Sequence, residues 1–234
     1  MLNQLLKFWL QNIYPSVALL IATVGTVGLG GCLLSLWLLA HLFEEILEQE
    51  SFAFDEAILL WIHQFANPGL DSLMLLITHL ANPEVAIPLT GITVGLLLWR
   101  RYVQEAQIFL IACLGGAILN VGLKLLFSRV RPELWPRLIT ETSFSFPSGH
   151  ALGSVVLYGM TGYLLAQHYP HQSRMIYGLA LSMITAISLS RLYLGVHWPT
   201  DILAGWSIGF IWVMICITLL KLRRLQSSGH YSNH

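Results

Sequence analysis

The sequence predicts an all-α, polytopic membrane protein: a bundle of six transmembrane helices, with short interfacial helices between the first and second spans. Two observations lead to this prediction. Of the 234 residues, 56% are hydrophobic and only 10% are charged, whereas soluble domains carry about 25% charged residues. Charged residues are also missing in long blocks, at 8–43, 106–123, 151–173 and 202–220. Each block is long enough for a helix to cross the hydrocarbon core of a bilayer.

The first two spans are predicted from the N-terminal half. Val17–Ala40 is too long for the hydrophobic region of a cleavable signal peptide and lacks a clear cleavage site, so we expect it to be retained. Pro83–Trp99 is the weakest span, because it is short and contains Pro88. A proline is tolerated in the first turn of a helix, where its missing N–H is not needed.

The segment between these spans, Phe52–Leu80, is apolar but interrupted by polar and helix-breaking residues such as His63, Asn67 and Pro68. This pattern favours two amphipathic helices that lie in the membrane interface over another crossing.

The remaining spans are predicted at Glu105–Phe127, His150–Gln167, Arg174–Tyr193 and Thr200–Lys221. No internal repeat or low-complexity segment is evident. We therefore expect one transmembrane domain over residues 1–234.

The positions of the basic residues predict the orientation. With six spans, both termini and the links at Arg100–Gln104 and His168–Ser173 share one side of the membrane. Seven basic residues fall on that side: Lys7, Arg100, Arg101, Arg174, Lys221, Arg223 and Arg224. Lys and Arg accumulate in cytoplasmic loops. The termini are therefore predicted to be cytoplasmic, in a plasma membrane of bacterial type.

The other five basic residues break this bias, because they lie near the opposite, outer face: Lys124, Arg129, Arg131, Arg137 and Arg191. Basic residues placed there are costly enough to indicate a function. Four motifs share this side, at Lys124–Pro132, Pro147–His150, Ser190–Arg191 and His197–Asp201. Alternating helix direction places all four at one membrane depth.

The cations and the helix start within these motifs suit a phosphate group. Lys124, Arg131 and Arg191 supply three positive charges, two of them as planar forks that match phosphate oxygens. Ser148 and Gly149 open a helix whose free N–H groups and dipole favour an anion.

The two histidines of the motifs can divide the chemistry of phosphate transfer. One can attack phosphorus while the other protonates the leaving oxygen. Asp201 follows His197 by four residues and can orient its imidazole ring, as a carboxylate does in a catalytic triad.

Together these residues fill every position of three spaced motifs, K-x6-R-P, P-S-G-H and S-R-x5-H-x3-D. In this the chain resembles the superfamily of type 2 phosphatidic acid phosphatases and vanadium-dependent haloperoxidases, over about 70–222. The resemblance implies that His197 is a nucleophile that forms a phosphohistidine, with Asp201 orienting it. It implies that His150 is the general acid and later the base. It further implies a set of phosphate-binding residues: Lys124, Arg131, Ser148, Gly149 and Arg191.

Two arginines of the same region lie outside the signature. For Arg129 and Arg137 we expect contacts with lipid headgroups or the protein surface, not a part in catalysis.

The predicted function is removal of phosphate from a lipid phosphate monoester or diphosphate at the outer membrane face. The resemblance offers phosphatidic acid, phosphatidylglycerophosphate and undecaprenyl pyrophosphate as substrates, and it implies no metal or other cofactor. The expected partners are the lipid substrate and the bilayer, without an obligatory protein partner. A formal net charge of zero gives no electrostatic case for nucleic acid.

Two other functions remain open. A vanadate-dependent haloperoxidase would use the same anion cradle, but the resemblance implies that such peroxidases are soluble. A non-catalytic protein that binds or transports lipid phosphates is the second alternative. The presence of His150, His197 and Asp201 argues against it.

Overall fold

The computed structural model describes residues 24–47 and 53–231, and the regular elements among them are all helices. The all-α fold class is therefore confirmed. In chain order the elements are α3 (Thr26–Leu47), α4 (Ala53–His63), α5 (Pro68–His79), α6 (Pro83–Trp99), α7 (Val103–Phe127), α8 (Gly149–His168), η2 (Pro170–Gln172), α9 (Ser173–Tyr193) and α10 (Pro199–Tyr231).

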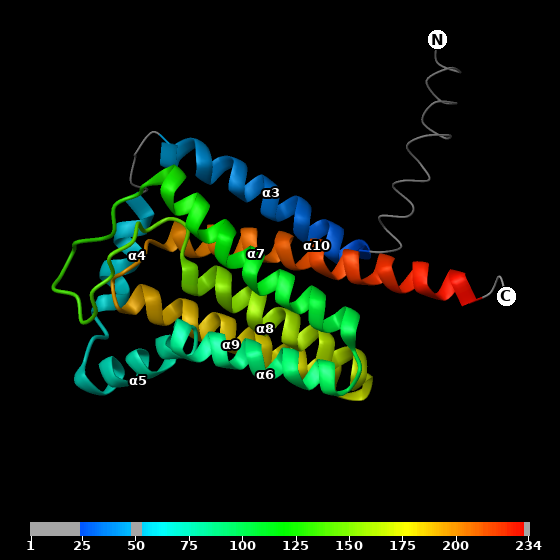
Figure 1. Ribbon diagram of the computed structural model, residues 1–234. Coiled ribbons are helices and arrows are strands. Elements are labelled where there is room, and N and C mark those ends of the chain that lie inside the picture. The colour runs from blue at the N-terminus through cyan, green and yellow to red at the C-terminus, as the bar shows by residue number, and fades with distance from the viewer. Residues whose placement is uncertain (1–23, 48–52, 232–234) are drawn as a thin grey trace, which may run out of the picture.

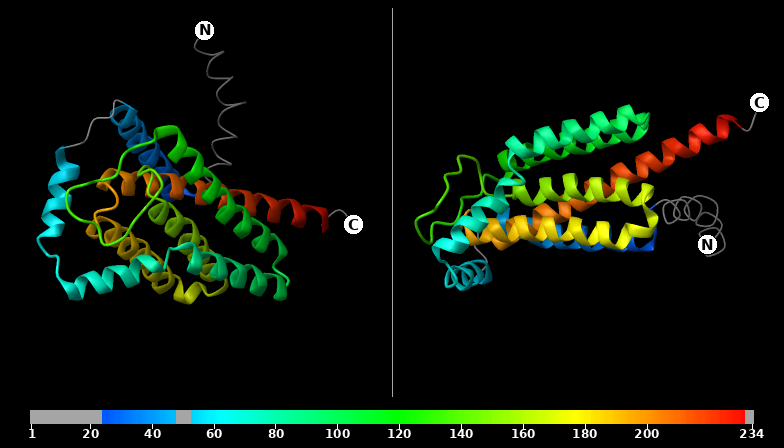
Figure 2. Two further views of the ribbon diagram at one scale, coloured as in Figure 1. Left: turned by 60° about the vertical axis from the view of Figure 1, so that its left-hand side comes forward. Right: turned by 90° about the horizontal axis from the view of Figure 1, so that it is seen from below.

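The long helices lie side by side, and the bundle has two different ends (Figures 1 and 2). One end carries α4, α5 and the α7–α8 connector, residues 128–148. The other carries the turns from α6 to α7 and from α8 to α9. These two turns meet, since the rings of Tyr102 and His168 lie 4.5 Å apart.

Helix α8 lies at the centre of the bundle, where it packs against α7, α9 and α10. Its buried side chains, including Leu152 and Met160, join Phe109 of α7 and Cys216 of α10 in one core cluster. A Cβ added at Gly205 of α10 would lie 2.9 Å from the carbonyl oxygen of Ser148. The start of α8 and the second turn of α10 therefore approach each other closely.

Four helical segments of the described residues are long and apolar enough to cross a membrane: Thr26–Glu44, Val103–Phe127, Pro170–Tyr193 and Pro199–Ser227. The pair α5 and α6, bent by 41° at its break, would make a fifth. Helix α8 is not among them, because it includes polar residues such as Ser154 and Thr161. A helix covered by three others has less need of an apolar surface than one that faces lipid.

The predicted helix positions agree with the structure in most places. Helix α6 has the predicted ends of the second span, and helices cover the four later spans, with α10 continuing to Tyr231. The predicted start of the first span, Val17, lies outside the described residues. Two helices occupy the predicted interfacial segment. Pro88 lies in the second turn of α6, so the condition for its tolerance, a place in the first turn, is not met.

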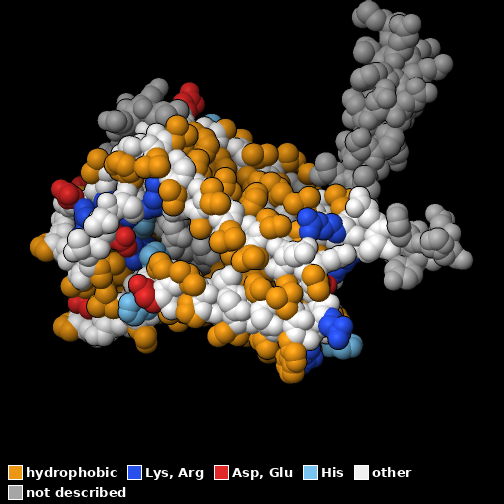
Figure 3. Space-filling view, viewed as in Figure 1, with side chains coloured by type: hydrophobic (Ala, Val, Ile, Leu, Met, Phe, Trp, Pro, Cys, Tyr) orange, Lys and Arg blue, Asp and Glu red, His pale blue; other side chains and the backbone are white. Residues whose placement is uncertain are grey.

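Apolar side chains cover most of the long face of the bundle in Figure 3, and charged side chains gather near its ends. Exposed large residues include Leu96, Leu114, Ile118 and Leu179. Such continuous apolar surface is what lipid chains solvate.

Candidate active site

All eight predicted site residues lie at the end of the bundle that carries the α7–α8 connector. Six of them are buried: Lys124, Arg131, Ser148, Arg191, His197 and Asp201. Gly149 and His150 are half-buried. The residues come from the end of α7, the connector, the start of α8, the end of α9, the link from α9 to α10, which carries His197, and the start of α10.

His197 is held between an arginine and a carboxylate. Its Nε2 lies 3.2 Å from Nη1 of Arg131, and its Nδ1 lies 3.3 Å from Oδ2 of Asp201. Because a guanidinium has donors and no acceptor, Nε2 must carry a lone pair. The proton therefore sits on Nδ1 and is donated to Asp201.

The surroundings of His197 keep its ring neutral. Burial lowers the pKa of His197 well below 6.5, and the positive charges of Arg191, Arg131 and Lys124 lower it further. A neutral ring with an unprotonated Nε2 is the nucleophilic form of histidine.

Asp201 is fixed by its place at the start of α10. It is the third residue of that helix, and its Oδ2 accepts the backbone N–H of Trp198 at 2.8 Å, as in a capping box. The same oxygen accepts the hydroxyl of Ser145. The start of α10 thus aims the carboxylate at His197, four residues earlier.

The headgroup or surface role expected for Arg129 is wrong. Its side chain is only 11% exposed and forms ion pairs with Asp201 at 2.7 Å and with Asp55 at 3.1 Å. Asp55, on α4, is fully buried and also accepts the backbone N–H of Thr200 at 3.0 Å. Burial raises the pKa of Asp55, while its bonds from Thr200 and the charge of Arg129 oppose that rise.

Lys124 and Arg131 are held by the connector. Lys124 donates to the carbonyl of Phe144 at 2.6 Å and to the hydroxyl of Ser143 at 2.9 Å. Arg131 donates to the carbonyl of Val196 at 2.6 Å and, through Nε, to that of Ser143 at 2.8 Å. Arg131 is therefore fixed next to His197, and Lys124 is fixed at the carbonyl of Phe144 that Arg131 also bonds.

Arg191 completes the cation group from the end of α9. Its Nη1 donates to the hydroxyl of Thr78 at 2.8 Å, and its Nη2 forms an ion pair with Glu141. Its buried Nε has no hydrogen-bond partner among the described residues. A buried donor without a partner is unfavourable, so this N–H is suited to an anionic ligand.

Glu141 of the connector lies between two of these cations. One carboxylate oxygen pairs with Arg191, and the other lies 3.7 Å from Nη2 of Arg131. Burial alone would raise the pKa of Glu141, but the charges of Arg191 and Arg131 outweigh it and lower that pKa. An ionised carboxylate thus occupies part of the predicted phosphate site.

His150 faces the site from the first turn of α8. Its Nε2 lies 2.8 Å from Oδ1 of Asn82, which can only accept, so Nε2 carries a proton. The Nδ2 of Asn82 lies 2.6 Å from Nδ1 of His79. A chain of three polar side chains therefore leads from His150 to α5.

Ser148 and Gly149 shape the start of α8. The hydroxyl of Ser148 caps the helix by accepting the N–H of Ala151 at 3.4 Å, and its own N–H donates to the carbonyl of Asp201 at 3.1 Å. A Cβ at Gly149 would lie 2.9 Å from Oδ1 of Asn120. Glycine therefore allows α8 to start close to α7.

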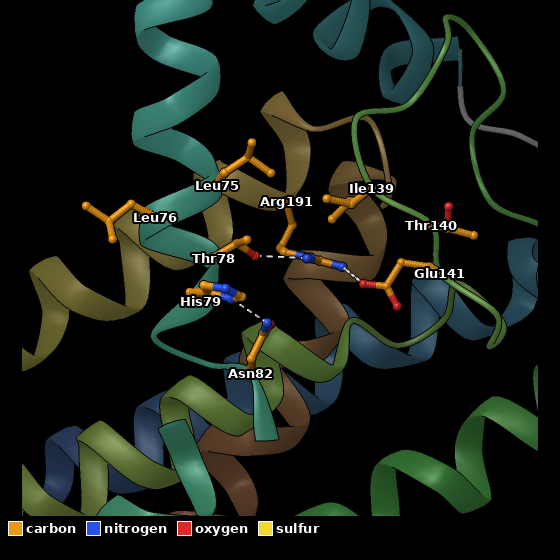
Figure 4. Close-up of a pocket in the computed structure, with 9 residues that line it drawn as sticks. All are labelled: Leu75, Leu76, Thr78, His79, Asn82, Ile139, Thr140, Glu141 and Arg191. Atoms are coloured by element: carbon orange, nitrogen blue, oxygen red, sulfur yellow. Dashed lines mark hydrogen bonds and ion pairs between the residues drawn. The ribbon is translucent and has the colours of Figure 1, made fainter. Parts of the chain in front are cut away.

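A cavity of about 590 Å³ opens beside Arg191 (Figure 4). Arg191 extends between Thr78 and Glu141, with His79 and Asn82 nearby. The lining combines these polar groups with apolar side chains: Leu75 and Leu76 of α5 and Ile139 of the connector. Such a mixed lining fits a ligand with a charged end and an apolar remainder.

The sequence did not reveal several residues of this site: Asp55, Thr78, Asn82, Arg129, Glu141 and Ser145. The available signal was weak. Several other acidic residues precede or adjoin Asp55, Asn82 lies in a short link before Pro83, and Glu141 is the one acidic residue between Glu133 and Asp201.

The family is decided by comparison with known proteins. The model of the PAP2 superfamily matches residues 105–225. The chain belongs to the PAP2 superfamily. Among PAP2-type relatives, phosphatidylglycerophosphatase B of Bacillus subtilis is 36% identical over 160 residues, which are 67% of this chain and 78% of that protein. The undecaprenyl-diphosphatase of Sulfolobus acidocaldarius is 30% identical over 145 residues, 60% of this chain and 66% of that protein.

Solved structures give the same result. The transmembrane PAP2-type phosphatidylglycerolphosphate phosphatase of Bacillus subtilis superposes with a TM-score of 0.70 at 31% identity, over 78% of this chain and 93% of that one. LpxE of Aquifex aeolicus superposes with a TM-score of 0.59 at 23% identity, over 72% of this chain and 97% of that one. This likeness supports the fold alone. With its apolar helices, this PAP2 member is an integral membrane protein.

Proposed function

We propose that this protein is a lipid phosphate phosphatase that works through a phosphohistidine on His197. One observation carries the proposal: the bare Nε2 of His197 faces Arg131, while Nδ1 is held by Asp201. A nucleophile and a phosphate-binding cation are thus already adjacent. Lys124 and Arg191 add two more cations to the same end of the bundle.

In the first step, Nε2 of His197 attacks phosphorus and forms an N–P bond as the P–O bond to the lipid breaks. For this step His150 is protonated on both ring nitrogens; it gives one proton to the departing oxygen and is left as a neutral ring. Lys124, Arg131 and Arg191 stabilise the charge that develops on the phosphoryl oxygens, with Ser148 and Gly149 at the helix start. Asp201 stabilises the positive charge that His197 acquires.

In the second step, His150 takes a proton from water, and the water oxygen attacks phosphorus. The N–P bond breaks, its electron pair returns to Nε2, and phosphate leaves. Both histidines then have their starting protonation states. Because the residues of the chain supply the charges that each step needs, we propose that turnover requires no metal, so that chelation with EDTA leaves the rate unchanged.

The named activities of the relatives indicate the substrate class: phosphatidylglycerophosphate for one and undecaprenyl diphosphate for the other. The cavity beside Arg191 supports this class, since Leu75, Leu76 and Ile139 can contact an apolar group attached to the phosphate. We propose phosphatidylglycerophosphate first, because the more similar relative acts on it.

The proposed placement in the membrane has six spans, α3 and α6 to α10, with α4 and α5 in the interface. The turns near Arg100, Arg101 and Arg174 lie at the end opposite the site. The excess of basic residues at that end supports cytoplasmic termini and a site on the outer face of a bacterial-type plasma membrane.

The deciding experiment measures phosphate release by the purified protein. The substrates are phosphatidylglycerophosphate, undecaprenyl pyrophosphate, phosphatidic acid and a soluble aryl phosphate. We expect release from at least one lipid, and trapping of a covalent phosphoprotein that His197→Ala abolishes. Lipid binding without release would instead support the non-catalytic alternative, and halide oxidation with added vanadate would support a haloperoxidase.

The role of His150 has its own test. His150→Ala should lower the rate by about 100-fold or more on lipid substrates, whose leaving oxygen needs a proton. An activated aryl phosphate needs less protonation and should lose less. Equal losses on both substrates would contradict the assignment of His150 as the acid.

A further inference from the structure

Arg129 lies between two buried carboxylates. Its Nη1 is 2.7 Å from Oδ1 of Asp201, and its Nη2 is 3.1 Å from Oδ2 of Asp55. Both aspartate side chains are fully buried. Without the guanidinium, two carboxylates would share one buried region with no cation between them, and one of them would hold a proton.

The two oxygens of Asp201 have different partners. Oδ2 accepts hydrogen bonds from the N–H groups of His197 and Trp198. Oδ1 accepts a hydrogen bond from Arg129. The arginine therefore fixes the plane of the carboxylate that orients His197. A charge-assisted bond of this kind is stronger than a neutral one and more demanding in geometry.

Asp55 holds Arg129 from the other side and connects it to α4. The same carboxylate accepts the N–H of Thr200 at 3.0 Å and its hydroxyl at 2.5 Å, which ties α4 to the first turn of α10. Arg129 also donates to the Thr200 hydroxyl at 2.7 Å and lies 5.6 Å from the centre of the Trp198 ring. Its position is thus determined by several independent contacts.

We propose that Arg129 is a positioning residue for the Asp201–His197 pair, and that Asp55 of α4 holds Arg129 in that place. The inference rests on the proposed function, because it takes His197 as the nucleophile. It assigns to α4, which contributes no signature residue, a part in keeping Asp201 ionised and aligned.

The expected pH effect depends on the charges around Asp201 and His197. The charged groups that face them are Asp55 on α4, Lys124 on α7, Arg129, Arg131 and Glu141 on the connector, His150 on α8 and Arg191 on α9. Of these, Arg129 is the cation that bonds Asp201 directly. Its loss should therefore affect the ionisation of Asp201 most.

Arg129→Met should lower kcat by roughly 10- to 100-fold, the range typical of groups that orient a functional ligand. It should also move the acid limb of kcat/KM to higher pH by about 1 to 3 units, because without the positive charge of Arg129 the carboxyl of Asp201 is protonated more easily. Adding Asp55→Asn to this variant removes the repelling carboxylate. The acid limb should then return toward its wild-type position, which a role in packing alone does not predict.

Arg129→Lys provides a second variant that keeps the charge. A lysine ammonium lacks the planar fork with which the guanidinium bonds Asp55 and Asp201 at once. We therefore expect kcat to fall about 10-fold while the acid limb stays in place. Unchanged kcat in this variant would overturn the proposal, even if Arg129→Met failed to fold.

Arg224→Met is the matched control. Arg224 of α10 forms an ion pair at 2.7 Å with Glu105 of α7, at the end of the bundle far from the site. The same substitution on this second ion pair should leave kcat and the pH profile as in the wild type. Equal changes in Arg224→Met and Arg129→Met would overturn a specific role for Arg129.

A measurement independent of turnover separates this inference from the proposed function. In ¹⁵N spectra of histidine-labelled protein, the His197 signal is identified by its loss in His197→Ala. We expect a protonated Nδ1 in the wild type and a loss of this tautomer in Arg129→Met. If the wild type releases no phosphate, the proposed function fails, and these spectra still decide the role of Arg129. An unchanged tautomer together with an unchanged acid limb would overturn it.

Discussion

The imidazole ring of His197 is buried and surrounded by cationic side chains. Both features keep the ring neutral and so affect the pH range of activity. The pKa of His197 lies well below 6.5, and in the proposed mechanism the reactive form is the deprotonated one. As the pH falls, protonation of His197 therefore sets in only when the pH approaches this lowered pKa.

The acid limb of kcat/KM, which reports the free enzyme, should therefore have its midpoint below pH 6.5. Initial rates on a soluble aryl phosphate over the acid range would measure it. Arg224→Met serves as a control with an intact site. A midpoint at or above the ordinary histidine value would contradict the assigned environment of His197.

In the proposed mechanism, Glu141 competes with phosphate for the same cations. Its carboxylate pairs with Arg191 and lies 3.7 Å from Arg131, so a phosphate that binds there must displace it. Glu141→Gln removes this competing charge. Inorganic phosphate should then inhibit about 10-fold more strongly, which corresponds to about 1.4 kcal/mol.

The competitive inhibition constants of inorganic phosphate for the wild type and Glu141→Gln provide the measurement. Glu133→Gln, on the exposed part of the same connector, is the control, because Glu133 pairs only weakly with Arg137 at 3.4 Å. Weaker inhibition in Glu141→Gln would show that the carboxylate helps to form the anion site.

At the scale of elements, the site depends on how closely α10 approaches α8. Gly205→Ala would place a Cβ 2.9 Å from the backbone oxygen of Ser148, which has to move. Overpacking of this kind costs about 1–3 kcal/mol. The melting temperature should fall, and activity with it, since Ser148 and Asp201 lie at these two helix starts.

Gly91→Ala on α6 is the matched control, because a Cβ there meets no described atom within 4 Å. Both substitutions raise helix propensity equally, because each replaces glycine with alanine. The difference between their melting temperatures therefore reports the packing effect at Gly205 alone. Thermal unfolding in detergent measures it. Equal melting temperatures for the two variants would contradict the close approach of α8 and α10.

The helices were predictable because each apolar block had charged or turn residues at its ends. The central position of α8 was not, since its polar residues lower its hydropathy but do not indicate that α7, α9 and α10 cover it. Pro88 shows the limit of local rules: α6, which has no buried residue, accommodates proline in its second turn.

At the scale of the whole molecule, the signature residues were predictable because their spacing is local and their helix ends alternate. The partners Asp55, Asn82 and Glu141 were not, because tertiary folding alone brings them to the site. Asp55 and Thr200 are 145 positions apart in sequence, yet their hydrogen bond ties α4 to α10. No periodicity of the chain encodes such a pairing.

The predicted site residues lie where α7 ends and α8 and α10 begin, at one end of the bundle (Figure 1), and this has a consequence for lipid traffic. A bilayer keeps its headgroups in two separate leaflets, and a one-ended enzyme reaches only one of them. In sealed vesicles with uniformly inserted protein, hydrolysis should stop when the facing leaflet is exhausted and resume once detergent or a flippase mixes the pools. Complete hydrolysis without mixing would contradict this sidedness.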